Sequence, residues 1–478
     1  MRECGRRLLF ILLVSAVNSA CVRVGFDLDA PARPDAAGDA GGTGDAGDTG
    51  EQLDVGALPD GSASDAGDAG DPSDAASDAA SDAGDTIDAS TWIQRVQPPN
   101  DRPTGSGFTE AIDLGLAVRD DSTVFVSWSD MSDGRLQMYL KYLEPQGSWQ
   151  GLGNSGDVGG ISATTSDTYA CGLKLDAAGR PYVLWMERDR RNDFLGMFVR
   201  HWDGSAWAPL PGQQPADPLD TEVNAFWPVM VLDSQDFPVI AWQALRLGLW
   251  STYVARWNGT AWVGLDTSLS DGGISGPGEV ELNAITLGRD GAVHVVWREI
   301  DVAGVHSSIQ HRFFDGTTWR SFAGDISTPG RDVERPSIAI TAANLPVVAW
   351  GYTDTHEVQV ARVEGTTWTD VSDAPGTPAS TGTANASNPN ILTTDDDRLF
   401  LFFDADTAAG RGVYVRTWDA QEKRWKAMDG ERALGLIEAS SGTGGWPRAA
   451  ISGGMLYVIW EEPDGNGGSA IRIYQHPI

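Results

Sequence analysis

The feature that most restricts the fold of this chain is a repeat of about 55 residues that fills positions 91–478. An apolar stretch ending in an aromatic residue recurs seven times, at spacings of 57, 57, 55, 53, 53 and 57 residues. These aromatic residues are Trp128, Trp185, Trp242, Trp297, Trp350, Phe403 and Trp460. In six repeats a second tryptophan follows 18–22 residues later, usually as Asp/Asn-Gly-x-x-Trp: Trp149, Trp207, Trp262, Trp319, Trp368 and Trp425.

Each repeat has the pattern of four short strands. An alternating run such as 230–232 precedes the first aromatic residue by about twelve positions, and turn residues separate the two. In four repeats a proline stands just before this run: Pro228, Pro336, Pro389 and Pro447. Proline has no N–H to donate to a neighbouring strand, and the first residue of a strand does not need one. A third alternating run, such as 413–416, leads through an Asp-Gly or Asn-Gly hairpin to the second tryptophan. No segment keeps a 3.6-residue apolar period for twelve residues, so we expect helices to be minor.

Seven such units predict an all-β fold, a seven-bladed β-propeller of four-stranded antiparallel blades over residues 91–478. The last unit lacks a second tryptophan, which would fall near position 482, beyond Ile478. Residues 88–96 resemble the missing strand, and Trp92 precedes Trp149 by 57 residues. We therefore expect the N-terminal strand around Trp92 to complete the last blade. The alternative is an open array of β-sandwiches. The repeated tryptophans are expected to serve mainly in packing within and between blades, not as a binding site.

The N-terminus has the pattern of a secretory signal peptide over residues 1–20. A basic start precedes ten apolar residues, 8–17, which as a helix would reach about 15 Å, half of a bilayer core. The sequence Asn18-Ser19-Ala20-Cys21 resembles the lipobox of bacterial lipoproteins, although Asn18 stands where an aliphatic residue is usual. The resemblance implies lipidation of Cys21, a lipid-anchor segment over 21–26 and a place in the cell envelope, at the outer membrane or cell surface. Ordinary signal cleavage, with Cys21 a free thiol, is the alternative.

Residues 27–90 repeat Asp-Ala-Gly and Ser-Asp-Ala units and carry a net charge of −16. Such a segment cannot bury enough apolar surface to offset its chain entropy, so we expect a disordered linker. A calcium-binding role is the alternative, but the fixed Asp/Gly/Glu spacing of a cation loop is absent. The remaining domain has 49 acidic and 29 basic residues, a net of −20, and the whole chain has −33. This charge argues against nucleic acid as a partner.

The hairpins Trp-Asp-Gly-Ser-Ala-Trp (202–207) and Trp-Asn-Gly-Thr-Ala-Trp (257–262) resemble the Asp-box repeats of sialidase-type propellers, and more loosely those of fucose-binding propeller lectins. The Asp-box pattern is Ser/Thr-x-Asp-x-Gly-x-x-Trp, whereas Asp and Gly are adjacent here. The Phe/Tyr-Arg-Ile-Pro motif of sialidases is missing from the sequence. The resemblance therefore implies an architecture and carries over no catalytic residue.

The sequence contains neither a Gly-x-Ser-x-Gly nucleophile motif nor a phosphate-binding loop ending in Gly-Lys. The six histidines form no His-x-x-x-His pair, and His306 and His311 are expected at the surface. We therefore predict no catalytic motif, no metal site and no cofactor.

A set of residues at strand ends is the candidate binding site. In a propeller, the connections between second and third strands and those between blades lie on one face. Acidic residues follow the second strand, and two tryptophans and an arginine precede the first strand: Asp130, Glu187 and Glu299, and Trp227, Arg335 and Trp446. Carboxylates beside indole rings suit a glycan, through hydrogen bonds and stacking. The alternative is that the acids are solvated ends of strands.

The sequence thus favours an envelope-tethered, monomeric recognition module for a protein or a glycan, with the membrane contacted through the N-terminal lipid. Two alternatives remain open. One is a secreted glycan-active hydrolase or lyase that uses two of Glu187, Glu299 and Asp130, since paired carboxylates roughly 5–10 Å apart can cleave a glycosidic bond. The other is a structural envelope protein without a small-molecule site.

Overall fold

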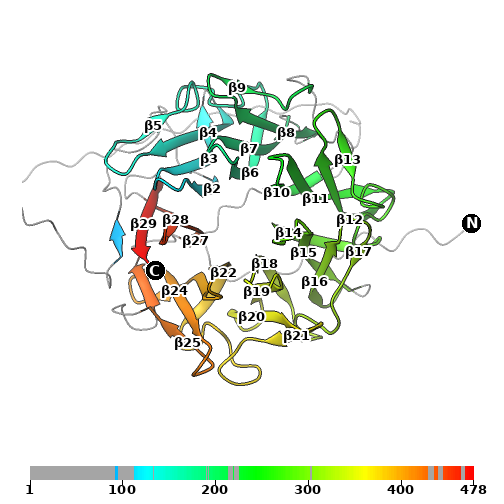
Figure 1. The fold of residues 1–478 in the computed structure, drawn as a ribbon, viewed down its shortest axis with the longest axis vertical. Coiled ribbons are helices and arrows are strands. Elements are labelled where there is room, and N and C mark those ends of the chain that lie inside the picture. Colours follow the sequence, from blue (N-terminus) through cyan, green and yellow to red (C-terminus); the bar gives the residue numbers. More distant parts are fainter. Residues whose placement is uncertain are drawn as a thin grey trace, which may run out of the picture. The chain divides into compact units, whose positions relative to one another are not determined.

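Seven antiparallel sheets arranged around a central axis form the described part of the chain (Figure 1). The computed structural model describes residues 92–94, 112–132, 134–189, 191, 193–213, 219, 225–301, 304–428, 435–439, 445–463 and 469–478. The predicted signal peptide, lipid-anchor segment and linker lie outside these residues. Within them there is no α-helix, and hence none that could cross a membrane. The prediction of an all-β, seven-bladed propeller is confirmed.

The blades are numbered in chain order, and their strands are given from the centre outward. Blade 1 contains β2 (Ile112–Val118), β3 (Val124–Ser132), β4 (Arg135–Leu143) and β5 (Gln150–Gly151). Blade 2 contains β6 (Asp167–Leu175), β7 (Pro181–Arg188), β8 (Phe194–Trp202) and β9 (Trp207–Ala208). Blade 3 contains β10 (Ala225–Leu232), β11 (Pro238–Arg246), β12 (Leu249–Trp257) and β13 (Trp262–Gly264). Blade 4 contains β14 (Glu279–Leu287), β15 (Val293–Ile300), β16 (Ser307–Phe314) and β17 (Trp319–Arg320).

The remaining three blades follow the same order. Blade 5 contains β18 (Val333–Ile340), β19 (Pro346–Tyr352), β20 (Glu357–Glu364) and β21 (Thr367–Asp370). Blade 6 contains β22 (Ala384–Thr393), β23 (Leu399–Thr407), β24 (Gly410–Asp419) and β25 (Arg424–Ala427), with a fifth strand, β26 (Leu436–Ala439), beside β24. Blade 7 contains β27 (Gly445–Ser452), β28 (Met455–Pro463), β29 (Ser469–Pro477) and β1 (Ile93–Gln94).

The last blade is completed by the N-terminal strand. Strand β1 pairs antiparallel with β29, so that Ile93 lies opposite Gln475 and Gln94 opposite Tyr474. The neighbouring Trp92 is only 9% exposed. The predicted closure is therefore confirmed, and it joins the two ends of the repeat array into a ring.

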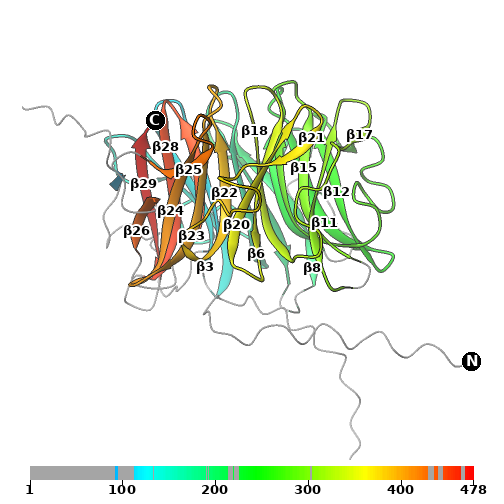
Figure 2. The ribbon, with the colours of Figure 1, turned by 90° about the horizontal axis from the view of Figure 1, so that it is seen from below.

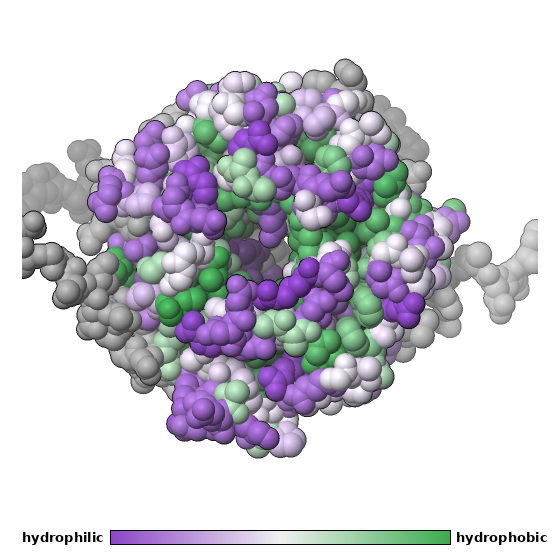
Figure 3. Space-filling view, viewed as in Figure 1, coloured by the Kyte–Doolittle hydropathy of each residue, from purple (hydrophilic) through white to green (hydrophobic). Residues whose placement is uncertain are grey.

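The repeated aromatic residues build the core, as expected. The first aromatic residue of every repeat lies on the second strand of its blade and is no more than 3% exposed. Seven hydrophobic clusters occupy the seven interfaces between neighbouring blades. The strands run between the two faces of the ring (Figure 2), and one of these faces is hollowed at its centre (Figure 3).

The second tryptophan links a blade to the one before it. The indole N–H groups of Trp207, Trp319 and Trp425 each donate to a main-chain carbonyl of the preceding blade, at 2.8 Å. The Asp or Asn of the motif closes the hairpin. Asp203 Oδ1, for example, accepts the main-chain N–H of Ala206 at 2.8 Å. The spacing Asp/Asn-Gly-x-x-Trp therefore sets both the turn and the contact between blades.

The position expected for the four prolines was wrong. Pro228, Pro336, Pro389 and Pro447 lie inside the innermost strands instead of at their first residue. At each of them the pairing with the second strand shifts register, and the three other innermost strands shift at the corresponding place. A proline without an N–H is tolerated there because the irregularity interrupts the ladder.

The expectation of a surface position was also wrong for His311, which is 5% exposed, whereas His306 is exposed. His311 Nε2 lies 3.1 Å from Nδ1 of His294, which is 2% exposed. The His311 ring contacts Phe313 and, from blade 5, Trp368. Burial lowers the pKa of His294 to about 4 and the pKa of His311 well below its ordinary value. Both rings are therefore neutral at pH 7.

This histidine pair predicts a loss of stability in acid. Between pH 6.5 and about 4, the unfolded chain binds a proton at His294 that the folded chain excludes. The free energy of unfolding should therefore fall by about 3 kcal/mol across this window from His294 alone. Urea unfolding at pH 7, 5.5 and 4.5 measures the change, and the double variant His294→Phe/His311→Phe should show a smaller dependence on pH. Equal slopes for the two proteins would contradict the prediction.

Candidate functional site

The six residues singled out from the sequence all lie toward one face of the ring, which we call the bulge face. On this face the innermost strands begin and the second strands end. The opposite face holds the turns between first and second strands. There the N–H of Ile478 donates to Gly454 O in the β27–β28 turn, and the C-terminus lies on the upper side of the ring in Figure 2.

Four residues of the bulge face have an unfavourable main-chain conformation. Trp227, Arg335, Asn388 and Trp446 have φ angles of 44°, 51°, 54° and 62°, and each precedes a proline. Residues before proline favour extended conformations, and the left-handed region costs a bulky residue roughly 1–2 kcal/mol. Such conformations persist only where surrounding contacts hold them.

Arg335 and Trp446 form the central contact of this face. The guanidinium carbon of Arg335 lies 3.8 Å from the centroid of the Trp446 ring. Arg335 comes from blade 5 and Trp446 from blade 7, so the contact passes over the start of blade 6. Trp446 remains 43% exposed. Arg335 Nε also lies 3.6 Å from a carboxylate oxygen of Glu334.

A buried carboxylate in blade 6 holds this arrangement. Asp404 is fully buried, and its Oδ2 accepts the main-chain N–H of Trp446 and the side-chain amide of Asn388, both at 2.8 Å. Its Oδ1 accepts the hydroxyl of Ser387 at 2.7 Å and a guanidinium N–H of Arg411. Burial would lower the pKa of Arg411, but the neighbouring carboxylates raise it above its ordinary value, so the cation is retained.

Asp404, Asn388 and Arg411 were not predicted from the sequence. Two signals were present. Asn388 precedes Pro389, as Trp227, Arg335 and Trp446 precede their prolines, and Asp404 is a charged residue in an otherwise apolar stretch. The partners of Asp404 come from three separate segments, which no local pattern brings together.

The three predicted carboxylates come from three different blades, and Glu187 and Glu299 each bond to a tryptophan of their own strand. Glu187 is 8% exposed and accepts the indole N–H of Trp185 at 3.0 Å and the hydroxyl of Thr164 at 2.9 Å. Glu299 accepts the indole N–H of Trp297 at 3.1 Å. Glu187 belongs to blade 2 and Glu299 to blade 4, with blade 3 between them. Each carboxylate thus accepts a hydrogen bond from the indole N–H of the tryptophan two residues before it on the same strand.

Asp130 and Trp227 belong to other blades than the Arg335–Trp446 contact. Asp130, in blade 1, is 8% exposed and accepts the main-chain N–H of Met131 at 2.6 Å. Trp227, in blade 3, is 42% exposed and lies 5.7 Å from Phe226, measured between ring centroids. Of the six predicted residues, Arg335 and Trp446 are in direct contact.

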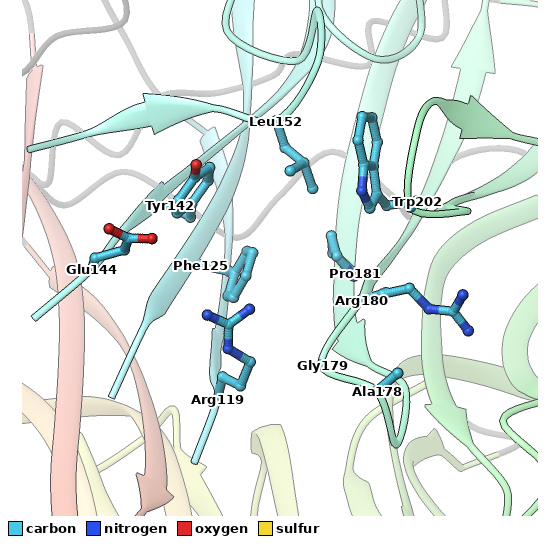
Figure 4. Close-up of a pocket in the computed structure, with 11 residues that line it drawn as sticks. Arg119, Phe125, Tyr142, Glu144, Leu152, Ala178, Gly179, Arg180, Pro181 and Trp202 are labelled. Carbon is cyan, nitrogen blue, oxygen red and sulfur yellow. The ribbon is translucent and has the colours of Figure 1, made fainter. Parts of the chain in front are cut away.

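A cavity of about 220 Å³ lies on the opposite face, between blades 1 and 2 (Figure 4). Phe125, Tyr142 and Trp202 line it, together with Arg119 and Arg180. Each arginine is paired with a nearby aspartate of its own turn, at 2.7 Å. The cavity is smaller than most small-molecule sites, which span about 300–1,000 Å³. No group of three or more His, Cys, Asp or Glu side chains within the described ranges is arranged to hold a metal ion.

Comparison with known proteins gives similarity at the level of the fold. No family model and no curated protein matches the chain. A solved ulvan lyase, a polysaccharide lyase, shares 12% identity, with 76% of this chain and 94% of that chain covered and a TM-score of 0.46. A mutant sialidase of Trypanosoma rangeli shares 10% identity, with 77% and 54% covered and a TM-score of 0.40. An α-L-arabinanase of Penicillium chrysogenum shares 10%, with 65% and 93% covered and a TM-score of 0.40. The structural neighbours of this seven-bladed propeller thus include a sialidase and other glycan-active propellers.

Proposed function

We propose that this protein is a glycan-recognition module whose binding site lies on the bulge face, at Trp446 and Arg335. The observation that carries the proposal is the exposed indole of Trp446, which stacks against a cation from a blade that is not its neighbour, while a buried carboxylate holds the main-chain N–H of the same residue. An ordered aromatic face of this kind loses little conformational freedom when a ligand covers it.

The chemistry of the two side chains suits a sugar ring. The apolar C–H face of a pyranose packs on an indole, and its hydroxyl groups accept hydrogen bonds from a guanidinium. Arg335 has a partly exposed side chain, and the carbonyl oxygen of the Asn388 side chain is buried without a hydrogen-bond partner among the described residues. A hydroxyl group or a water molecule reaching Asn388 would satisfy that acceptor.

The same proposal places the module at the cell envelope through a lipid on Cys21, with residues 27–90 as the linker. It is supported by the sequence alone: the short apolar run, the Ser-Ala-Cys sequence and the acidic low-complexity segment. Cells that express the protein should incorporate radiolabelled palmitate into it, and the Cys21→Ala variant should not. Equal labelling of the two proteins would contradict the anchor.

Binding on a glycan array, followed by titration of the best ligand, tests the proposed site. Trp446→Ala should weaken binding by about tenfold or more, because it removes the stacking surface. Arg335→Gln should weaken it by a smaller factor. Val263→Ala, on the outermost strand of blade 3, is the control and should bind as the parent protein does.

Each bound glycan is also assayed for release of new reducing ends or unsaturated products. Binding without release, lost in Trp446→Ala, supports the proposal. Release that is abolished by Glu187→Gln or Glu299→Gln would replace it with the hydrolase or lyase alternative. Absence of glycan binding in the folded protein would overturn it.

A further inference from the structure

The hairpins between the third and fourth strands of blades 2, 3 and 4 share one arrangement, in which the side chain of an Asp or Asn closes the turn. In blade 3 this residue is Asn258, and its Oδ1 accepts the main-chain N–H groups of Thr260 at 3.0 Å and Ala261 at 2.9 Å. The hydroxyl of Thr260 donates to the same oxygen at 3.0 Å. A single amide oxygen thus receives three hydrogen bonds.

The corresponding residues of the two neighbouring blades are aspartates. Asp203 Oδ1 accepts two main-chain N–H groups and a serine hydroxyl, at 2.7–2.9 Å. Asp315 Oδ1 accepts two main-chain N–H groups at 2.9 Å and the hydroxyl of Thr317 at 2.6 Å. The pKa of Asp203 is lowered, mainly by the N–H of Ala206. The pKa of Asp315 is lowered, mainly by the Thr317 hydroxyl. The hairpin therefore favours a carboxylate at the position that Asn258 occupies.

The groups that an asparagine needs for cyclisation are available at this hairpin. The nucleophile is the main-chain nitrogen of the next residue, and the N–H of Gly259 donates no hydrogen bond to another described residue. The leaving group is the side-chain NH₂, and that of Asn258 has no hydrogen-bond partner in the described part of the chain either. Asn258 is exposed, so water reaches the site. Gly259 has no side chain that would hinder closure of a ring.

We propose that Asn258 is a site of autocatalytic deamidation, at which the hairpin converts its own amide into the aspartate found in blades 2 and 4. The Gly259 nitrogen bonds to Cγ of Asn258 and gives up its proton, and the Cγ–NH₂ bond breaks, which releases ammonia and leaves a succinimide. Water then opens the ring at Cγ and restores the N–H of Gly259. The net reaction converts an amide and water into a carboxylate and ammonium. The proposal goes beyond glycan recognition and does not depend on it.

The three donors to Oδ1 act on both steps. Negative charge develops on this oxygen when the nitrogen attacks, and fixed donors stabilise such an oxyanion. After the ring opens, the same donors hold the new carboxylate as they hold those of Asp203 and Asp315. Opening at the main-chain carbonyl would give isoaspartate, which inserts an extra carbon into the main chain of a hairpin whose ends pair at Trp257 and Trp262. The folded hairpin should therefore favour aspartate as the product.

Peptide mapping by mass spectrometry of the intact protein, incubated at 37 °C and pH 8, tests the proposal. The peptide that contains residue 258 should gain the mass of an NH-to-O exchange and coelute with a synthetic aspartyl standard, not with the isoaspartyl one. Thr260→Ala removes one donor to Oδ1 and should slow the reaction about fivefold. Thr260→Ser keeps a hydroxyl, as in blade 2, and should react as the parent does. Gly259 is left unchanged, because its φ of 96° favours glycine.

Three controls separate activation by the hairpin from the intrinsic reactivity of an Asn-Gly sequence. In concentrated urea, the parent and Thr260→Ala should react at equal rates, because the hairpin is lost. Asn466, which is also followed by glycine, should react equally in the parent and in Thr260→Ala. Asn258→Asp, which has the sequence of the product, should unfold thermally at or above the midpoint of the parent.

Several outcomes would overturn the proposal. They are an unchanged Asn258 after four weeks, isoaspartate as the main product, and equal rates for the folded parent and folded Thr260→Ala. A difference between these two proteins that persists in urea, or that is as large at Asn466, would show that it does not arise in the hairpin. A lowered midpoint for Asn258→Asp would show that the blade 3 hairpin does not accept a carboxylate.

Discussion

Substitution of Asp404 by alanine should lower the free energy of unfolding by about 3–5 kcal/mol, because it removes one member of a buried ion pair. Asp404 is 0% exposed and accepts four hydrogen bonds, including one from the guanidinium of Arg411. Without the carboxylate, the Arg411 cation, the Asn388 amide and the N–H of Trp446 lose a buried partner. Urea unfolding at pH 7 measures the effect.

A neighbouring carboxylate provides the matched control for this prediction. Asp406 also pairs with Arg411, at 2.9 Å, but its side chain is 43% exposed. Asp406→Ala should therefore cost no more than about 1 kcal/mol. The double variant Asp404→Ala/Arg411→Ala should be less destabilised than the sum of the two single variants, because it leaves no uncompensated cation. Equal effects of Asp404→Ala and Asp406→Ala would refute this account of the network.

Substitution of Trp92 by alanine is expected to destabilise the propeller by about 3–5 kcal/mol, as for other large-to-small changes in a core. Trp92 is 9% exposed, lies 5.1 Å from the ring of His476, and meets Phe402 of blade 6 edge-on at 6.2 Å. Its indole N–H has no hydrogen-bond partner among the described residues. Packing is therefore the main contribution that this side chain makes to the closure of the ring.

Thermal and urea unfolding of Trp92→Ala and of Trp227→Ala test this prediction together. Trp227 is 42% exposed, so its removal should change the free energy of unfolding by no more than about 1 kcal/mol. A small effect of Trp92→Ala, comparable to that of Trp227→Ala, would show that β1 is dispensable for a stable ring.

The architecture was predictable from the sequence because each blade repeats the same local pattern. An aromatic residue at the end of an apolar strand and an Asp-Gly hairpin before a second tryptophan specify strands, turns and packing direction within about 55 residues. The closure was predictable because the missing tryptophan of the last repeat has an equivalent in Trp92, at the repeat distance from Trp149.

The main-chain detail of the site was not predictable, because it opposes the local preference. The residue before a proline is normally extended, yet Trp227, Arg335, Asn388 and Trp446 have positive φ angles. Predictions from local sequence fail most often where contacts with neighbouring elements hold the main chain in another conformation. At Trp446 this contact is the hydrogen bond from its main-chain N–H to the carboxylate of Asp404.

Burial of His311 escaped prediction for a related reason. Its surroundings include Phe322 and Trp368, which lie 11 and 57 residues further along the chain. The alternation of residues along β16 shows which side chains lie on the same side of the strand. It does not show which of the two sides is covered by aromatic rings from other segments of the chain.

The pairing of β1 with β29 also dictates an order of events during synthesis. Ile93 precedes its partner Gln475 by 382 residues, so the first strand of the domain cannot pair until blades 1–6 and the β28–β29 hairpin have been made. Until then, the edge that β1 will cover does not exist, and any polypeptide that stops before β29 has an open ring. Synthesis of the β28–β29 hairpin thus serves as a check on chain length, because only a chain that includes β29 can close the ring.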